Sequence, residues 1–150
     1  MKNVLSCRGA FNQAEVETVM KSMEAIIAEN GAAKTGPTVS ATFAVSQSDG
    51  MPVFDMEILI PVDKELVFTS ETITFKPLFR LTNALVIRHV GNPNTMINTI
   101  TALNSYITEN KLTPITSAYN VTVKEARYPS EIDSMIVDVY VGVREEENIL

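Results

Sequence analysis

Apolar residues recur every three or four positions in two segments of the chain, the spacing of one face of a helix. The first segment is 12–31, where the shared face would hold Val16, Val19, Met20, Met23 and Ile27. Asn12, with Glu15 three residues later, predicts the helix start, and Gly31 predicts its end. An amphipathic helix is therefore expected between these signals.

The second helical segment is 92–110. Its apolar face would consist of Met96, Ile100, Leu103 and Ile107. Asn92 is a suitable cap, and Pro93 suits the first helical position because its fixed φ matches the helix and it lacks the N–H that would be unpaired there. Both segments finish with the pair Glu-Asn.

Alternating apolar and polar residues predict strands in the same order around both helices. The first helix is preceded by a strand at 3–7 and followed by strands at 38–46 and 53–62; the second has counterparts at 83–90, 117–125 and 133–143. The sequence therefore predicts two consecutive copies of a β-α-β-β unit. The expected fold is α+β, with one curved, antiparallel-rich sheet, two helices on one of its faces and a pseudo-two-fold axis.

The halves are expected at about 1–63 and 70–144, followed by an acidic tail at 145–150. The extended segment 64–79 between the halves is expected to add to the first strand of the second half.

Composition narrows the class of protein. The 150 residues, 45% of them hydrophobic, suit one domain with a real core. A net charge of −6 argues against a general nucleic-acid-binding surface. One cysteine and one histidine leave no set of His and Cys ligands for zinc, and no segment suggests a membrane span or a signal peptide. A cytoplasmic protein without metal or cofactor is expected.

Two strands place a carboxylate among apolar residues. Because side chains alternate between the faces of a strand, Met135, Val137, Val139, Val141 and Val143 would face the helices, and Asp138 and Tyr140 would face the other way. In the first half, Glu57 and Leu59 take the equivalent places. The two carboxylates are therefore expected on the face of the sheet away from the helices, outside the core.

Three stretches resemble one known family: "ITFKPLFRLTNALVIRHVGN", "LNSYITENKLTP" and "VDVYVGV". They are similar to the GyrI-like, or multidrug-activator effector-binding, domain. That resemblance implies a duplicated β-α-β-β module that binds small organic molecules in the cleft between its halves. The sequence also resembles small uncharacterised stand-alone proteins of this fold in Gram-positive bacteria, some linked to secreted-toxin loci.

The resemblance implies roles for individual residues. Asp138 and Tyr140 match the acidic and aromatic pocket positions of the closing strand, Glu57 and Leu59 match their counterparts, and His89 matches the "RH-x-G" start of the second helix. Such sites attract cationic, often aromatic ligands. The chain departs from the family in having "NPN" after Gly91, where the family often has Pro-Tyr, and in having no tryptophan. No DNA-binding head is expected beside the duplicated fold.

Plainer interpretations stand beside these. The face with Glu57 and Asp138 could simply be solvated, as one face of an antiparallel sheet often is. His89 could be a structural residue, or could pair with Cys7 by pseudo-symmetry as a nucleophile, although no third group is evident to orient such a pair. Tyr119 and Phe43 lie on strands whose phase the sequence leaves open.

The leading hypothesis is a stand-alone binding module for a small, cationic or amphipathic ligand, without catalytic residues. Its expected ligand-binding residues are Glu57, Leu59, Asp138, Tyr140, His89 and Tyr119. The alternative is a protein-interaction adaptor or chaperone-like partner associated with a secreted-toxin locus. A small hydrolase of the same fold is a third hypothesis, against which the missing tryptophan argues. The oligomeric state stays open, and neither nucleic acid nor membrane is an expected partner.

Overall fold

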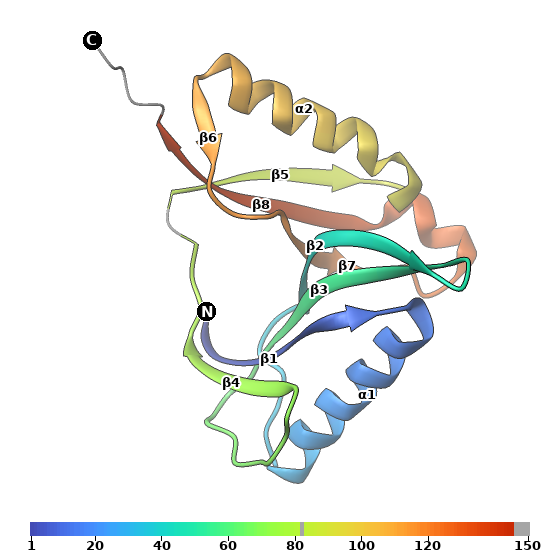
Figure 1. Ribbon diagram of the computed structural model, residues 1–150, viewed down its shortest axis with the longest axis vertical. Helices are drawn as coiled ribbons and strands as arrows, with labels where there is room; N and C mark the ends of the chain where they lie inside the picture. Colours follow the sequence, from blue (N-terminus) through green and yellow to red (C-terminus); the bar gives the residue numbers. More distant parts are fainter. Residues whose placement is uncertain (82, 146–150) are drawn as a thin grey trace. The chain divides into compact units, whose positions relative to one another are not determined.

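The computed structural model describes residues 1–81 and 83–145. The chain forms two compact units, Met1–Arg80 (unit 1) and Leu81–Leu150 (unit 2). Each unit combines an antiparallel sheet with one α-helix lying along it (Figure 1). The predicted α+β class and the repeated order of strand, helix and two further strands are confirmed. The predicted acidic tail lies, apart from Glu145, outside the described residues.

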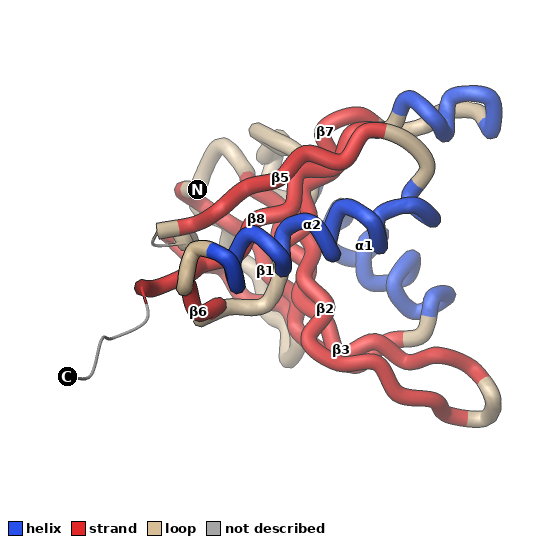
Figure 2. Tube along the Cα trace, turned by 90° about the horizontal axis from the view of Figure 1, so that it is seen from above, coloured by secondary structure: helices blue, strands red, loops and turns tan. Residues whose placement is uncertain are grey.

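Unit 1 has a four-stranded sheet in the order β4-β1-β3-β2. Its elements are β1 (Lys2–Phe11), α1 (Gln13–Glu29), β2 (Val39–Ser48), β3 (Met51–Pro61) and β4 (Ile73–Leu78). The hairpin of β2 and β3 closes through Asp49 and Gly50, both with positive φ, as a two-residue type I′ turn requires. Figure 2 shows these two strands running out together to that turn.

Unit 2 has the strand order β7-β8-β5, with a short additional strand, β6, also paired to β8. Its elements are β5 (Ala84–Val90), the 3₁₀ turn η1 (Pro93–Thr95), α2 (Met96–Glu109), β6 (Leu112–Pro114), β7 (Tyr119–Lys124), the 3₁₀ turn η2 (Pro129–Ser134) and β8 (Ile136–Glu145). The sequence pattern did not predict β6, since three residues are too few to show a period.

Helix α1 begins and ends where the sequence predicts. Asn12 and Glu15 form a reciprocal capping box, in which the Glu15 N–H donates to the Asn12 side chain at 2.9 Å and the Asn12 N–H donates to the Glu15 carboxylate at 3.2 Å. Gly31 follows the helix with a φ of 61°. The helix buries Met23 and Ile27 in a core that includes Leu5, Cys7, Met56, Ile58, Ile60 and Val62.

The second helical segment begins differently from the prediction. Pro93 starts a 3₁₀ turn, capped by the Asn92 side chain, and the α-helix proper begins at Met96. Its apolar face is as predicted: Leu103 and Ile107 are buried, and Met96 and Ile100 pack beside them, against Val137, Val139, Val141 and Val143. Met135 precedes β8 and is not part of this core.

One predicted connection is wrong. The segment 64–79 does not extend the first strand of unit 2; its strand β4 pairs antiparallel with β1, with Phe75 opposite Leu5. Burial explains this pairing, because Ile73 is part of the unit 1 core and Phe75 packs against it. Unit 1 therefore includes β4 and ends at Arg80.

Neither helix of the described part of the chain has both the length and the apolar character needed to span a bilayer.

Candidate functional site

Glu57 and Asp138 occupy the same register position in the two units. On β3, Glu57 lies opposite Arg8 of β1 on one side, and on β8, Asp138 lies opposite Arg88 of β5. On the opposite side, Glu57 is paired with Ala41 of β2, and Asp138 is paired with Val121 of β7. The equivalence inferred from the duplicated sequence is therefore present in the strand pairing itself.

Both carboxylates are buried, although neither belongs to a helix-facing core. Glu57 is 7% exposed and Asp138 is 8% exposed. Their strand neighbours Ile58 and Val139 point into the two cores, so each carboxylate points to the opposite face of its sheet. The interpretation that these positions are simply solvated is therefore wrong for these two residues. A buried carboxylate needs donors, and each has them in its own unit.

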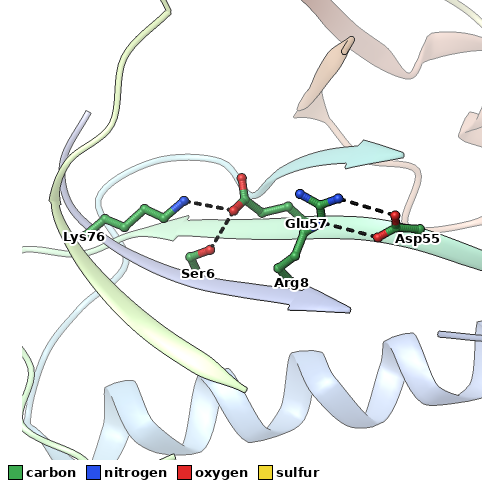
Figure 3. A network of polar contacts seen from close by, with 5 residues as sticks. All are labelled: Ser6, Arg8, Asp55, Glu57 and Lys76. Carbon is green, nitrogen blue, oxygen red and sulfur yellow. Dashed lines mark hydrogen bonds and ion pairs between the residues drawn. The ribbon is translucent and has the colours of Figure 1, made fainter. Parts of the chain in front are cut away.

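In unit 1, two donors satisfy Glu57 (Figure 3). Its Oε2 accepts hydrogen bonds from Ser6 Oγ at 3.1 Å and from Lys76 Nζ at 2.9 Å. Lys76 comes from β4, the strand whose position the sequence did not predict, and its side chain is 37% exposed. Beside Glu57, Leu59 is fully buried on the same face. Leu59 therefore has no surface to offer a ligand, contrary to its expected role.

Arg8, although opposite Glu57 in register, makes its ion pair elsewhere. Its Nε and Nη2 lie 3.3 and 3.4 Å from the two carboxylate oxygens of Asp55, as Figure 3 shows. Its guanidinium carbon lies 3.8 Å from the centre of the Phe43 ring. Phe43 occupies an irregularity in the pairing of β2 with β3, which explains why its phase could not be predicted.

In unit 2, the arginine opposite the carboxylate does bind it. Arg88 Nε and Nη2 donate to Asp138 Oδ1 and Oδ2 at 2.8 and 2.9 Å, which makes a bidentate ion pair. The Arg88 side chain is 54% exposed, whereas that of Asp138 is 12% exposed. The hydrogen bond from Arg88 lowers the pKa of Asp138, an effect that burial opposes and the positive charge of Arg88 reinforces.

Two tyrosines lie on the same side of the sheet as Asp138. Tyr119 of β7 and Tyr140 of β8 are directly opposite each other, which settles the phase that the sequence left open. Across β8, the partner of Tyr140 is Val86 of β5, an exposed valine. We call the surface formed by these cross-strand partners the Asp138 face; it consists of Val86, Arg88, Tyr119, Val121, Asp138 and Tyr140.

The structure does not bring His89 to the Asp138 face. His89 is opposite Val137, whose side chain is part of the helix-facing core, and the His89 ring is buried at the start of the second helical segment. Its Nδ1 lies 2.7 Å from Thr99 Oγ1, and its Nε2 lies 3.0 Å from the Asn92 carbonyl oxygen. Because a carbonyl oxygen only accepts, Nε2 is the donor to Asn92, and in a neutral ring Nδ1 then accepts from Thr99. These contacts are those of a structural histidine.

Cys7 belongs to the unit 1 core, where burial raises the pKa of its thiol and a hydrogen bond with Thr72 partly offsets that rise. Both ring nitrogens of His89 are bonded within unit 2, so neither nitrogen is left to activate a thiol, as the Cys7–His89 pair considered from the sequence would require. No group of three or more potential metal-ligating side chains occurs among residues 1–81 and 83–145.

Sequence reasoning missed the donors Ser6, Lys76 and Arg88. A signal for Arg88 was present, because it is the one charged residue in "ALVIRHV", as Asp138 is in "VDVYVGV". Opposite charges in two apolar strands of one unit favour each other as cross-strand partners. No comparable signal marked Lys76, since its role depends on the pairing of β4.

Comparison with known proteins gives matches in structure only. No family model matches the chain, and no curated protein matches it. EcmrR, in a complex with DNA, aligns with a TM-score of 0.77 at 13% identity over 97% of this chain, which spans 55% of the EcmrR chain. The EcmrR C-terminal domain alone gives 0.69 at 12% identity, over 97% of this chain and 94% of that domain.

Two proteins from Listeria innocua have the same fold. An uncharacterised conserved protein gives a TM-score of 0.70 at 11% identity, covering 95% of this chain and 88% of its own. A hydrolase gives 0.65 at 13% identity, covering 95% and 87%. The chain therefore shares its α+β fold with the C-terminal domain of EcmrR and with these proteins, which is consistent with the GyrI-like fold that the sequence resembles.

Proposed function

We propose that the chain is a small-molecule-binding module of the GyrI-like group, and that the Asp138 face of unit 2 contacts the ligand. One observation carries this proposal: a buried carboxylate and two tyrosine rings occupy the same face of two neighbouring strands, β7 and β8. The fold shared with the C-terminal domain of a DNA-bound protein is in keeping with it.

The chemistry of this face favours an organic cation with an aromatic or apolar body. Asp138 supplies a negative charge, since its lowered pKa keeps it ionised at neutral pH. The faces of Tyr119 and Tyr140 can attract the same positive charge and can stack on an aromatic body. Val86 extends the surface with an apolar side chain that is 55% exposed.

Unit 1 is a poorer candidate for the ligand site. Glu57 is bonded to two donors, its neighbour Leu59 is fully buried, and its cross-strand partner on β2 is Ala41 rather than an aromatic residue. We therefore assign the Glu57 network to the stability of unit 1. The hydrolase alternative receives less support, because His89 is buried, bonded at both nitrogens and on the other face of β5 from Arg88.

The test is a thermal-shift titration of the full chain with ethidium, an aromatic cation. A ligand that binds only the folded chain stabilises it by RT ln(1 + [L]/Kd), about 2.7 kcal/mol at a concentration of 100 Kd. Asp138→Asn should lose the shift. The matched control is Asp55→Asn, which removes an exposed carboxylate from an ion pair in unit 1 and should keep it. No shift with wild type, or a shift that survives Asp138→Asn, would remove the support for this site.

A further inference from the structure

The Asp138 carboxylate is already matched by a planar cation of the same chain. Arg88 presents two N–H groups in parallel to the two carboxylate oxygens, at 2.8 and 2.9 Å. A guanidinium and a carboxylate fit one another in this way because both are planar and their donor and acceptor atoms are similarly spaced. The buried partner is the carboxylate, and the partner with access to water is the arginine.

Unit 1 shows that an arginine at this register position has a second arrangement. Arg8 lies opposite Glu57 just as Arg88 lies opposite Asp138, yet Arg8 is paired with Asp55, two residues along β3. Glu57 is then served by Lys76, a cation from another strand. Within this fold, the carboxylate can therefore be matched by a cation other than the arginine opposite it, while that arginine points elsewhere.

We infer that Arg88 holds the place of the ligand's cationic group, and that the ligands of the Asp138 face are aromatic amidines, guanidines and similar cations with two parallel N–H donors. This inference rests on the proposed function and adds the ligand class and a competing residue to it. On binding, the ligand takes over both hydrogen bonds to Asp138, and the Arg88 guanidinium turns to water. No covalent bond changes.

The ligand class follows from what the ligand must replace. Displacing Arg88 removes two charge-assisted hydrogen bonds from a carboxylate that is largely buried. An amidinium restores both bonds, whereas a quaternary ammonium has no N–H and restores neither. The cost of displacing Arg88 is the same for either ligand. Arg88 therefore weakens the binding of both ligands by the same factor. The difference between their affinities comes from the hydrogen bonds that each makes to Asp138.

Benzamidine and phenyltrimethylammonium are the matched probes, since both join a positive group directly to one benzene ring. Calorimetric titration of the full chain should give benzamidine at least about tenfold tighter binding. Arg88→Met keeps an apolar side chain and removes the guanidinium. It should tighten the binding of both probes by a similar factor of roughly tenfold. Arg88→Lys, which donates from a single point, should lie between wild type and Arg88→Met.

Arg8→Met is the control, because it removes the register-equivalent arginine and should leave both affinities unchanged. Circular dichroism and thermal unfolding of each variant confirm that the chain is folded at the temperature of the titration. If benzamidine binds wild type but Arg88→Met leaves its affinity unchanged or weakens it, the competition is refuted while the proposed function stands. Equal affinities of the two probes refute the ligand class. Binding of neither probe to wild type or to Arg88→Met overturns the proposed function and the inference with it.

Discussion

Tyr119 on β7 and Tyr140 on β8 face each other directly across neighbouring strands, two residues along β8 from Asp138 and on its side of the sheet. Cross-strand aromatic pairs stabilise a sheet, and here the pair also supplies the only rings of the Asp138 face. The two roles can be separated, because a phenyl ring preserves the π-face whereas leucine preserves only apolar volume.

We predict that Tyr119→Leu and Tyr140→Leu each weaken the binding of an aromatic cation by a few-fold to about thirtyfold, the range of a cation–π contact worth about 0.5–2 kcal/mol. Tyr119→Phe and Tyr140→Phe should bind nearly as well as wild type. Titration with ethidium measures the affinities, and Tyr128→Leu, at an exposed tyrosine before η2, is the control. Equal losses in the Phe and Leu variants would assign the effect to the hydroxyl groups instead of the rings.

The ion pair of Asp138 predicts how the stability of the chain depends on acid. The pKa of Asp138 is lowered in the folded chain, first by the hydrogen bond from Arg88, from an ordinary value of 3.8. A group with a lowered pKa stabilises the fold above its ordinary value, and this contribution is lost as the pH falls from there through the folded value. The free energy of unfolding should therefore fall below about pH 4, and less steeply in Asp138→Asn.

Urea unfolding of both proteins between pH 2 and pH 6 measures this difference. Arg88→Met provides an independent comparison, since without the arginine the carboxylate loses the principal cause of its lowered pKa. The same acid dependence in wild type and in both variants would show that Asp138 does not titrate as its contacts imply.

The sequence predicted those features of the fold that depend on local patterns. The capping box of Asn12 and Glu15 lies within four residues, and the apolar face from Met96 to Ile107 follows the period of one helix, so both were visible without knowledge of the partners. The alternation in β3 and β8 likewise placed Glu57 and Asp138 on the face away from the helices.

Features that depend on pairing between distant strands were predicted less well. The position of β4 beside β1 joins Leu5 to Phe75, and nothing in the pattern of 64–79 distinguishes that neighbour from β5. Because Lys76 reaches Glu57 only through this pairing, the donor that satisfies Glu57 could not be predicted either. The resemblance implies that His89 contacts the ligand, but its place in the alternation of β5, with Val137 opposite, directs it toward the helix.

The Glu57 network predicts a difference in stability between two carboxylates of β3. Glu57 is buried and accepts from Ser6 and Lys76, whereas Asp55 is paired with Arg8 at the surface. Glu57→Gln should lower the free energy of unfolding by about 1–3 kcal/mol, because buried polar groups lose charge-assisted hydrogen bonds. Asp55→Asn should cost less than about 1 kcal/mol, as exposed ion pairs usually do. Urea unfolding at neutral pH compares the two, and equal effects would contradict the role given to Glu57.

The contacts of His89 predict its tautomer. Its Nε2 faces the Asn92 carbonyl oxygen and its Nδ1 faces Thr99 Oγ1, so the neutral ring should carry its proton on Nε2. The ¹⁵N chemical shifts of the ring identify the protonated nitrogen. Thr99→Val should lower the free energy of unfolding by about 1–3 kcal/mol, because it leaves a buried acceptor without its donor. Thr101→Val, at a helix threonine whose hydroxyl bonds only to the backbone of α2, is the control. A proton on Nδ1 would contradict the hydrogen-bond directions assigned above.

Replacing Gly142 of β8 by alanine should create a steric clash that a second substitution can relieve. A Cβ atom at this position would lie 2.9 Å from Thr116 Cγ2. Thr116 is held in place because its Oγ1 accepts from the Gly142 N–H at 2.9 Å and donates to the Ser117 carbonyl oxygen at 2.8 Å. Gly142→Ala should therefore lower the free energy of unfolding by about 1–3 kcal/mol.

Thr116→Ser removes Cγ2 and keeps the hydroxyl with both of its hydrogen bonds, so the double variant Gly142→Ala/Thr116→Ser should recover most of the stability that Gly142→Ala loses. Gly36→Ala is the matched control, since its Cβ would meet only Pro61 Cγ, at an ordinary contact distance of 3.5 Å. Thermal and urea unfolding of wild type, Gly142→Ala, Thr116→Ser and the double variant complete the double-mutant cycle. If Thr116→Ser gives no recovery, the cost of Gly142→Ala does not come from Cγ2, and the nearby Ile115 side chain, 3.6 Å from the same Cβ position, becomes the group to test.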